Sequence, residues 1–435
     1  MSNNIGKSIH DLGKKIWPHN RSLTGHGVVK TLNELKKINP DLKIKKFKSG
    51  AKVFDWKIPD EWNVEDAYIL DPSGKKICDF KKNNLHLVGY SVPINNIISL
   101  KELQKHLHSI PEKPHAIPYV TSYYVKNWGF CITHNQRKKL KTGKYKVVIK
   151  SKIKKGLMHY GEILIKGKTK KEIFLSTYIC HPSMANNEIS GIIVTIFLSN
   201  WIKKIKKKYS YRIIFIPETI GSIAYLSKNI KYMKKNIFAG FAVTCIGDSR
   251  CYSYLPSRNE KTLSDKVSKH ILKNIDKKFK QYRWEDRCSD ERQYCAPGVD
   301  LPIATIMKSK PGSYPEYHTS LDNLKNVVTP KGLSEGFNAL QKIIEALNEN
   351  FYPVTNIICE PFLSKRNLYP TINDKAGSKI DNLSRLIIDT LSWCDGNHDI
   401  IDIAEKIRVP VWKLYPIISI LKKSKLIKNY NSFSI

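Results

Sequence analysis

The sequence predicts an α/β protein with a mixed, mostly parallel sheet flanked by helices, an inserted small β domain and a C-terminal winged-helix domain. Three observations predict this architecture. Strand-like and helix-like segments alternate between residues 172 and 347, as they do in sheets with parallel pairing. Residues 44–130 instead contain short apolar runs that Pro, Gly and Asn interrupt, which is typical of a small all-β module. Residues 380–435 return to compact helices.

The individual elements follow from these patterns. Residues 1–36 are expected to be helical. Later strands are expected at 144–153, 161–167, 172–180, 211–217, 239–247 and 301–307, and later helices at 190–204, 222–228, 262–276 and 330–347. We place the α/β domain at 1–43 and 131–358, the inserted β domain at 44–130 and the winged-helix domain at 359–435.

The chain is strongly basic, with 74 Lys+Arg against 38 Asp+Glu and a formal net charge of +36. Such a field favours anionic partners such as nucleic acid, anionic lipid or acidic glycans. Lysines are spread along nearly the whole chain and far outnumber arginines, however. This distribution indicates a general compositional bias more than a dedicated binding face.

Cysteine usage and hydropathy bear on the compartment. Nine cysteines, an odd number with no C-x-x-C pair, argue against a disulfide framework. Residues 1–17 contain no apolar segment of a secretory signal. The longest mostly apolar run, 189–202, is too short to span a bilayer. We therefore expect a cytoplasmic protein with no membrane span.

Metal-competent or catalytic side chains end three consecutive predicted core strands. These are His181, Glu218 and Asp248, and His318 follows a further strand. In open α/β sheets, ligands bind beyond the carboxyl ends of the strands. Two histidines and two acids that meet there form a nitrogen and oxygen ligand set that suits zinc.

Five motifs, CHPS, NNEISG, PETIGS, TCIGD and YHTSLDN, occur in this order. They resemble the pattern of the zinc aminopeptidase superfamily, which also contains glutaminyl cyclases. Four longer segments more closely resemble a bacterial family of aminopeptidase-like proteins. They are HPSMANNEISG, RIIFIPETIGSIAYL, GDSRCYSYLPSR and SDERQYCAPGVDLP. That family carries an inserted β domain and a C-terminal winged helix, and its genes often occur among surface-polysaccharide or other biosynthetic genes.

The resemblance implies roles for individual residues. It implies Glu218 as the catalytic base and one or two zinc ions at His181, Glu188, Asp248 and His318. It further implies substrate contacts by residues near these motifs, namely Asn187, Asp290, Glu291, Arg292 and Tyr317. Such a zinc ion would lower the pKa of its bound water to about 7 and polarise the scissile carbonyl.

Three positions depart from the superfamily pattern. Asn187 stands where an Asp bridges two zinc ions, Thr219 where a second acid follows the base, and Ser183 where an Asp follows the first His. These departures favour one metal ion rather than two, or a chemistry other than peptide hydrolysis.

The C-terminal helices resemble a helix-turn-helix followed by a wing. The second helix offers Trp412, Lys413 and Tyr415, without the Arg, Asn or Gln cluster that reads bases. Pro416 is expected to distort this helix. We therefore favour protein interaction or homo-oligomerisation through this domain over nucleic-acid binding.

Two functions of different classes remain open from the sequence, and a third possibility keeps the metal but changes the chemistry, for instance to acyl transfer. The first is a metal-dependent, aminopeptidase-like hydrolase that cleaves an amide bond in a small peptide or in an aminoacyl or N-acyl biosynthetic intermediate, with a link to surface polysaccharide. The alternative is a protein whose hydrolase site has decayed and which acts through its winged helix as a protein- or DNA-binding module.

Overall fold

A computed structural model of the chain describes residues 2–369 and 381–429. These residues form two compact units. Unit 1 comprises Met1–Asp265 and Phe279–Asn338, and unit 2 comprises Lys266–Lys278 and Ala339–Ile435. Residues 370–380 and 430–435 of the predicted winged-helix domain lie outside the described part of the chain.

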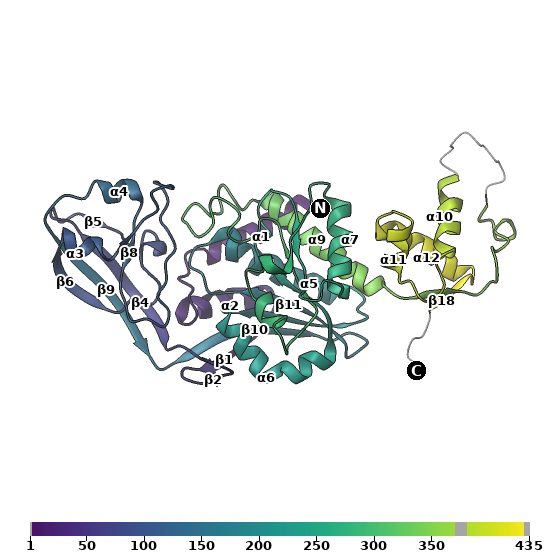
Figure 1. Cartoon of the computed structure of the whole chain (residues 1–435), viewed down its shortest axis with the longest axis horizontal. Coiled ribbons are helices and arrows are strands. Elements are labelled where there is room, and N and C mark those ends of the chain that lie inside the picture. Colours follow the sequence, from purple (N-terminus) through teal and green to yellow (C-terminus); the bar gives the residue numbers. More distant parts are fainter. Residues whose placement is uncertain (1, 370–380, 430–435) are drawn as a thin grey trace. The chain divides into compact units, whose positions relative to one another are not determined.

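The chain's first half begins with helices and then forms mainly strands (Figure 1). Its elements are α1 (Ser2–Ile16), α2 (His26–Ile38), β1 (Lys43–Lys48), β2 (Lys52–Val53), β3 (Trp56–Lys57), β4 (Glu61–Leu70), β5 (Lys76–Ile77), β6 (Ile94–Ser99), α3 (Leu100–Gln104), β7 (Leu107–His108), β8 (Phe130–Cys131), α4 (His134–Lys138), β9 (Lys144–Lys154) and β10 (Leu157–Ile165).

Strands and helices alternate in the second half. The elements are β11 (Glu172–Tyr178), α5 (Ser190–Lys204), β12 (Ser210–Ile216), α6 (Ile220–Asn236), β13 (Ile237–Val243), β14 (Ser253–Leu255), α7 (Leu263–Ile275), β15 (Lys280–Gln281), α8 (Glu291–Tyr294), β16 (Ile303–Met307), α9 (Pro330–Glu349), β17 (Pro353–Thr355), α10 (Asp381–Leu391), α11 (Ile400–Lys406), α12 (Leu414–Lys423) and β18 (Ile427–Asn429). A π-helical turn, η2 (Ala185–Ile189), directly precedes α5.

The main sheet of unit 1 has eight strands in the order β1-β10-β12-β11-β13-β16-β14-β15. Its centre, β12-β11-β13-β16, and the edge pair β14-β15 are parallel, whereas β1 and β10 pair antiparallel with their neighbours and β14 pairs antiparallel with β16. The predicted mixed, mostly parallel sheet is therefore confirmed. The parallel centre is the part that brings several strand ends to one edge.

Helices cover both faces of this sheet. On one face, α5 packs so closely that a Cβ added at Gly191 would lie 2.5 Å from the carbonyl oxygen of Val243. On the other face, Phe174 of β11 packs against Tyr225 of α6 and Tyr294 of α8, with ring centroids 6.5 and 5.1 Å away. The strands between these layers are buried almost throughout, which explains their nearly continuous apolar sequences.

A second, four-stranded antiparallel sheet has the order β5-β4-β9-β6. It contains β9, which lies C-terminal to the predicted inserted domain 44–130, while β1 pairs with β10 of the main sheet. Trp62 and Tyr90 share one apolar core cluster with Phe174 and Tyr225 of the main sheet. The domain boundaries drawn from the sequence stay a prediction.

The predicted helical segment 1–36 is two helices rather than one. α1 ends at Ile16 and α2 begins at His26 after Gly25, whose φ of +92° is a conformation that favours glycine. The chain between them carries Arg21, which is fully buried. This interruption is what allows the N-terminal segment to reach the edge of the sheet.

In unit 2, α10, α11 and α12 are accompanied by the antiparallel pair β17-β18. Asp399 caps α11, because its side chain accepts a hydrogen bond from the Asp402 N–H at 2.9 Å. The prediction that Pro416 distorts this helix is wrong. Pro416 lies in the first turn of α12, where a backbone N–H has no partner within the helix.

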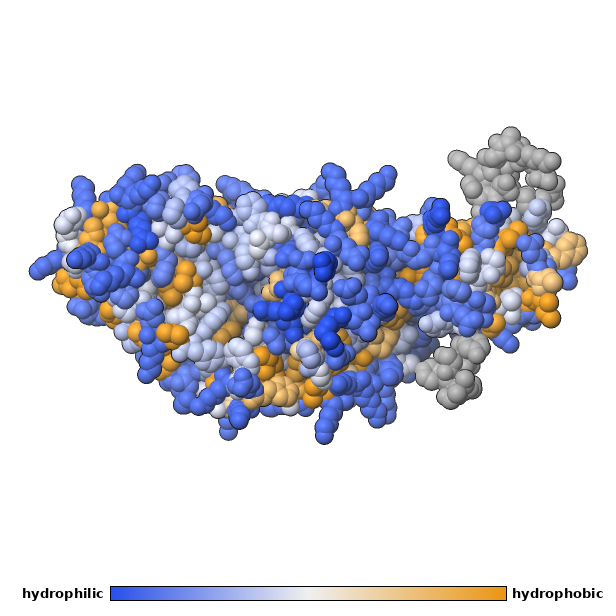
Figure 2. All heavy atoms as spheres, viewed as in Figure 1, coloured by the Kyte–Doolittle hydropathy of each residue, from blue (hydrophilic) through white to orange (hydrophobic). Residues whose placement is uncertain are grey.

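No helix of the described residues is long and apolar enough to cross a membrane. Hydrophilic side chains dominate the face that Figure 2 shows, and apolar atoms there form separate small areas.

We predict that Asp399→Asn weakens unit 2. Burial alone would raise the pKa of Asp399, but the hydrogen bond and charge of Lys266, 2.6 Å away, hold it below 3.8. Because the folded-state pKa is depressed, this contribution is present above pH ~4 and is lost as the pH falls through the folded-state pKa. The variant should cost about 1–3 kcal/mol at pH 7 and less at pH 2.

Urea unfolding of the full chain at both pH values measures the difference. Lys269→Met is the control, since Lys269 is exposed on the same helix as Lys266 and has no partner among the described residues. A loss for Asp399→Asn that is the same at both pH values would contradict the ion-pair assignment.

Candidate active site at the strand tips

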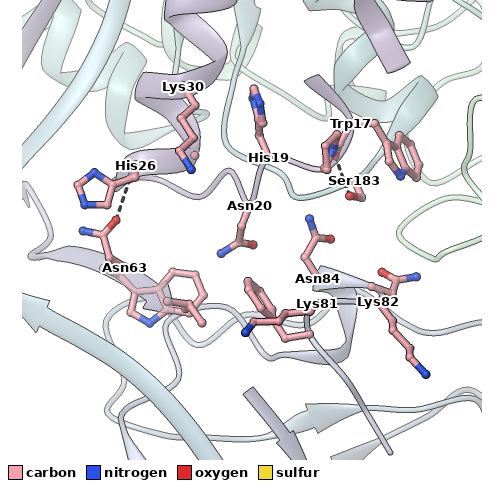
Figure 3. Close-up of a pocket in the computed structure, with 16 residues that line it drawn as sticks. Trp17, His19, Asn20, His26, Lys30, Asn63, Lys81, Lys82, Asn84 and Ser183 are labelled. Atoms are coloured by element: carbon pink, nitrogen blue, oxygen red, sulfur yellow. Dashed lines mark hydrogen bonds between the residues drawn. The ribbon is translucent and has the colours of Figure 1, made fainter. Parts of the chain in front are cut away.

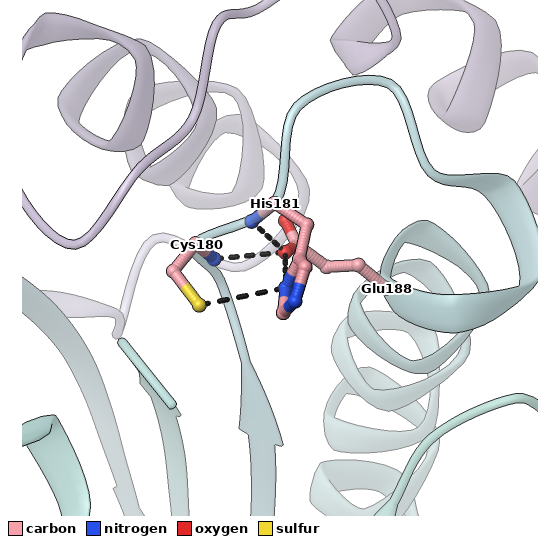
Figure 4. A group of neighbouring side chains, drawn as sticks. All are labelled: Cys180, His181 and Glu188. Carbon is pink, nitrogen blue, oxygen red and sulfur yellow. Dashed lines mark hydrogen bonds and ion pairs between the residues drawn. The ribbon is translucent and has the colours of Figure 1, made fainter. Parts of the chain in front are cut away.

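The turn after β11 folds back so that a carboxylate closes the end of the strand. The Oε2 atom of Glu188 accepts hydrogen bonds from the backbone N–H of Cys180 at 2.8 Å and from the N–H of His181. It also lies 2.9 Å from Nδ1 of His181 (Figure 4). The π-helical turn η2 places Glu188 there by inserting an extra residue into the start of α5.

Arg21 neutralises this carboxylate. Its Nε donates to Oε1 of Glu188 at 2.6 Å and its Nη1 donates to the Ile16 carbonyl at 2.7 Å. Both side chains of the ion pair are 0% exposed. A carboxylate at this depth requires a paired cation, because isolated charges are strongly disfavoured in a protein interior.

The Glu188 contact fixes the orientation of His181. When Nδ1 donates to the carboxylate, Nε2 keeps its lone pair, which is how carboxylate–histidine pairs prepare a metal ligand. Burial alone would lower the pKa of His181, but the hydrogen bond and charge of Glu188 raise it above 6.5. Nε2 points to the other side of the ring, where Oε2 of Glu218 lies 3.9 Å away.

His318 lies across from His181, with ring centroids 5.5 Å apart. Its Nε2 is buried and has no hydrogen-bond partner within the described structure. Burial and the nearby His181 lower the pKa of His318 to about 3, so the ring is neutral. Its φ of +53° is unusual for a residue with a side chain, and such strain is concentrated at functional sites.

Glu218 is oriented by a single side chain. Ser289 donates its hydroxyl to Oε1 of Glu218 at 2.6 Å, which leaves Oε2 facing His181. His181 and His318 thus offer two imidazole nitrogens, and the Glu218 carboxylate lies 3.9 Å from His181 Nε2. Imidazole nitrogens are donors that zinc accepts, and the unpaired buried Nε2 of His318 would be available to such an ion.

A different group, Cys180, His181 and Glu188, brings its ligand atoms within 4.8 Å of one another. An ion there would have to displace the hydrogen bonds that both oxygens of Glu188 already accept. Burial also raises the pKa of the Cys180 thiol well above its usual value, which disfavours the thiolate. This group therefore orients His181 instead of holding a metal.

Both carboxylate oxygens of Asp248 accept hydrogen bonds from other groups of the protein. Its Oδ1 accepts from the Arg250 N–H at 2.7 Å, and its Oδ2 accepts from Asn186 Nδ2 at 2.8 Å and from the Ser309 N–H at 3.2 Å. These bonds join the loop after β13 to the turn η2.

Asn187 is buried in the same turn. Its Oδ1 accepts from the Tyr178 hydroxyl at 2.7 Å, and its Nδ2 has no partner among the described residues. Its backbone N–H donates to Asp322 at 3.0 Å, and Asp322 also accepts from the Asn186 N–H at 2.7 Å. Burial raises the pKa of Asp322 to about 6.

Asp290 reaches the vicinity of Glu218. Its Oδ1 accepts from the Thr219 N–H at 2.7 Å and from the Ser222 hydroxyl at 2.9 Å, whereas Oδ2 is buried without a partner in the described structure. Burial and the charge of Glu218 raise the pKa of Asp290 to about 8. The site therefore contains a second acid, which comes from the 288–295 segment and not from position 219.

Glu291 and Arg292 hold this segment in place. Glu291 is fully buried and accepts from the backbone N–H of Ser289 at 2.8 Å and from the Thr305 hydroxyl at 3.1 Å. Arg292 donates to the Ser289 carbonyl at 2.8 Å and to the Thr219 hydroxyl at 3.3 Å. Both side chains are thus bonded within the protein.

Aromatic rings surround the two histidines. Tyr317 stacks on His318 with centroids 3.9 Å apart. The ring of Tyr119 lies 5.3 Å from His181 and 5.2 Å from His318, and its backbone N–H donates to the His318 carbonyl at 2.8 Å. The segment between β7 and β8 therefore covers the site.

A cavity of about 800 Å³ begins beyond this cover. Its walls include Tyr90, Tyr123, Tyr124 and several lysines. The Tyr123 hydroxyl lies 3.1 Å from that of Tyr119. Tyr123 in the cavity wall thus contacts Tyr119, which in turn lies beside the two histidines.

Sequence reasoning found His181, Glu218 and His318 but missed Arg21, Tyr119 and Asp322. Arg21 lies in a predicted helix and Tyr119 in the predicted β module, each far in sequence from the motifs. Asp322 was within a quoted motif, YHTSLDN, and its position four residues after His318 was the available signal.

The open sheet and its strand-tip histidines and glutamate define an aminopeptidase-like protein. The chain belongs to the family described as domain of unknown function DUF4910, which matches residues 10–350. A winged helix-turn-helix family matches residues 350–429. The predicted aminopeptidase-like fold and C-terminal winged helix are thereby confirmed.

Individual relatives agree with this assignment. A Clostridium acetobutylicum protein, named as a candidate polysaccharide biosynthesis protein with an aminopeptidase-like domain, is 40% identical over 406 residues, which are 93% of this chain and 92% of the relative. The crystal structure of a candidate peptidase from the same organism superposes with a TM-score of 0.92 at 37% identity, covering 99% of this chain and 97% of the other.

A more distant structure shows the fold alone. The zinc aminopeptidase of Bacillus subtilis has a TM-score of 0.57 at 13% identity and covers 80% of this chain and 95% of its own.

We predict that Arg21→Met destabilises unit 1 by about 3–5 kcal/mol, because it leaves the Glu188 carboxylate buried and unpaired. Arg258→Met is the matched control. The Arg258–Asp300 pair is about half exposed, at 43% and 44%, and should contribute less than about 1 kcal/mol. Urea unfolding measures both, and equal losses would contradict the dependence of the strand tip on Arg21.

Proposed function

We propose that the protein is a metal-dependent, aminopeptidase-like amide hydrolase that holds one zinc ion. The observation that carries this proposal is the pair His181 and His318 beside Glu218, in which the Nε2 atom of His318 is buried without a partner within the described residues. A decayed site would be expected to satisfy or replace such a nitrogen, since unpaired buried polar atoms are costly.

The ion would be held by the Nε2 atoms of His181 and His318. Glu188 and Asp248, which the sequence suggested as ligands, have both oxygens engaged by N–H donors. We therefore assign Glu188 to orienting His181. When bound, zinc supplies an activated water and polarises a substrate carbonyl.

Glu218 is the proposed general base. Ser289 holds Oε1, so that Oε2 faces the space beside His181 and is free to take a proton from the attacking water. The same carboxyl group would then deliver that proton to the leaving nitrogen. Asp290, oriented by Thr219 and Ser222, lies beside Glu218, whose charge and burial together raise the pKa of Asp290 to about 8.

The substrate is proposed to be a small peptide or an aminoacyl or N-acyl biosynthetic intermediate. The tyrosine-lined cavity beyond Tyr119 has the volume and mixed lining of a small-molecule site. The name of the Clostridium relative supports a link to polysaccharide biosynthesis. Tyr317 is proposed to contact the substrate because it stacks on His318 at the mouth of the metal site.

The alternative, action through the winged helix, has less support. Trp412 lies under the ammonium group of Lys342, 4.2 Å from its ring centroid, and Tyr415 lies near Glu345 and Glu349 of α9. Trp412 and Tyr415, two of the three side chains considered for recognition, thus have neighbours within unit 2. Homo-oligomerisation through this unit and a cytoplasmic location stay predictions.

We predict about one zinc ion per chain in purified protein, measured by elemental mass spectrometry. His181→Ala and His318→Ala should each lower the zinc content to near zero, since each removes a proposed ligand. His115→Ala is the matched control on an exposed histidine and should leave the content unchanged. Zinc retained in both site variants, or no zinc taken up by the wild type, would refute the proposed metal site.

We predict that Glu218→Gln keeps the zinc and lowers kcat by about 10²–10⁴-fold, because the base is lost while the histidines remain. Hydrolysis of a panel of aminoacyl anilides and N-acylated amino sugars by the wild type would identify the substrate on which this ratio is measured. Loss of zinc from Glu218→Gln would instead make Glu218 a ligand. A variant as active as the wild type would exclude Glu218 as the base.

A further inference from the structure

A second cavity, of about 530 Å³, lies outside the proposed metal site. It contains none of His181, Glu218 and His318. Its walls come from the segment between α1 and α2, the start of α2, the strand β4 and the turn before β6. The lining residues are Trp17, Pro18, His19, Asn20, His26, Gly27, Lys30, Trp62, Asn63, Val64, Phe80, Lys81, Lys82, Asn83, Asn84 and Ser183.

The lining of this cavity is cationic. It includes three lysines and no aspartate or glutamate. Lys81 is 3.4 Å from Asp66, whereas Lys30 and Lys82 have no ion-pair or hydrogen-bond partner within the described residues. Figure 3 shows the lysines distributed around the cavity, with Lys30 on one side and Lys81 and Lys82 on the other. Lys30 and Lys82 are exposed at the rim of the cavity, where an anion or bulk water balances their charge.

Amide side chains extend into the same space. Asn84 is 8% exposed, and its Oδ1 is buried with no hydrogen-bond partner in the described structure. Asn20 and Asn84 lie between the lysines in Figure 3. Because Asn84 lines the cavity, its NH₂ group is the part of the amide that would donate to a bound anion.

The start of helix α2 adds backbone donors. Its cap residue, Gly25, offers no side-chain hydrogen bond to the helix, and Gly27 lines the cavity. The N–H of His26 donates to Asn63 at 2.8 Å. Gly25 therefore provides no capping side chain for the following N–H groups of this 13-residue helix, and the positive end of the helix dipole favours an anion there.

The pKa of His19, which lines the cavity, is lowered by burial and by nearby positive charges. Burial, together with the charges of Arg21 and Lys30, lowers the pKa of His19 to about 4. The ring of His19 is therefore neutral, and its Nδ1 is bonded to the Thr31 hydroxyl at 3.0 Å. The cationic character of the cavity thus comes from the lysines and the helix.

We infer that this cavity binds the phosphate group of a small phosphorylated molecule. Converging ammonium groups, amide donors and a helix N-terminus are the groups that recognise phosphate oxygens. The volume exceeds that of a single phosphate, and Trp17, Trp62 and Phe80 offer apolar surface to the remainder of the ligand. The site is independent of the metal, so its test does not depend on hydrolase activity.

Isothermal titration calorimetry of the full chain with inorganic pyrophosphate tests this inference. The wild type is expected to bind one equivalent, and Lys30→Gln and Lys82→Gln should each weaken binding about tenfold by removing a charge-assisted hydrogen bond. Lys36→Gln is the matched control. Lys36 is exposed on the same helix, outside the cavity and without a partner in the described structure, so this variant loses the same charge and should keep the wild-type affinity.

Asn84→Asp provides a second test that conserves side-chain volume. The added negative charge should abolish pyrophosphate binding while thermal unfolding shows a folded chain. Equal affinity in the wild type, the lysine variants and Asn84→Asp would show a non-specific effect of the net charge and overturn the inference, as would no binding at millimolar pyrophosphate. Glucose 1-phosphate and uridine diphosphate, titrated in the same way, distinguish a sugar phosphate from a nucleotide as the source of the phosphate.

Discussion

The buried ion pair between Arg21 and Glu188 is the interaction on which the strand-tip site depends. Glu188 closes the end of β11 by accepting two backbone N–H groups and holds Nδ1 of His181. A carboxylate with this role has to be charged, and at zero exposure it stays charged only beside a cation. The N-terminal segment must therefore leave its helical path after Ile16 to deliver Arg21. The break between α1 and α2 and the orientation of His181 are consequences of one electrostatic requirement.

Hydrogen bonds hold two positions at which the sequence departs from the zinc aminopeptidase pattern that it resembles. Asn187, which stands where the resembled pattern has an Asp, donates its backbone N–H to Asp322, and its side-chain oxygen accepts from the Tyr178 hydroxyl. Thr219 replaces a second acid, and Asp290 accepts its N–H and brings another carboxyl group beside Glu218. The turn is thus preserved by hydrogen bonds, while the charge available for metal binding is reduced. The proposal of one ion rather than two rests on this reduction.

The chain between α1 and β9 supplies both cavities with much of their walls. Tyr119 covers the two histidines, and Tyr123 connects them to the larger cavity. On the other side of the strand tip, Trp62, Lys82 and Asn84 join the start of α2 to form the cationic cavity. The two cavities differ in chemistry, since one is rich in tyrosine and the other combines lysines with amides. This segment therefore contributes to the proposed recognition of substrate and of phosphate, whereas the main sheet supplies the proposed catalytic groups.

The sequence by itself determined the elements whose signals are local. Alternating strand and helix patterns marked the strands of the sheet's parallel centre, and the motifs at their ends contained His181, Glu218 and His318. Only the tertiary structure decided the roles of Glu188 and Asp248, because a carboxylate's role depends on which N–H groups surround it after folding. It also revealed Arg21 and Tyr119, which reach the site from distant segments with no motif of their own. Periodicity and spacing report neighbours along the chain, whereas burial and ion pairing arise from contacts between residues far apart in sequence.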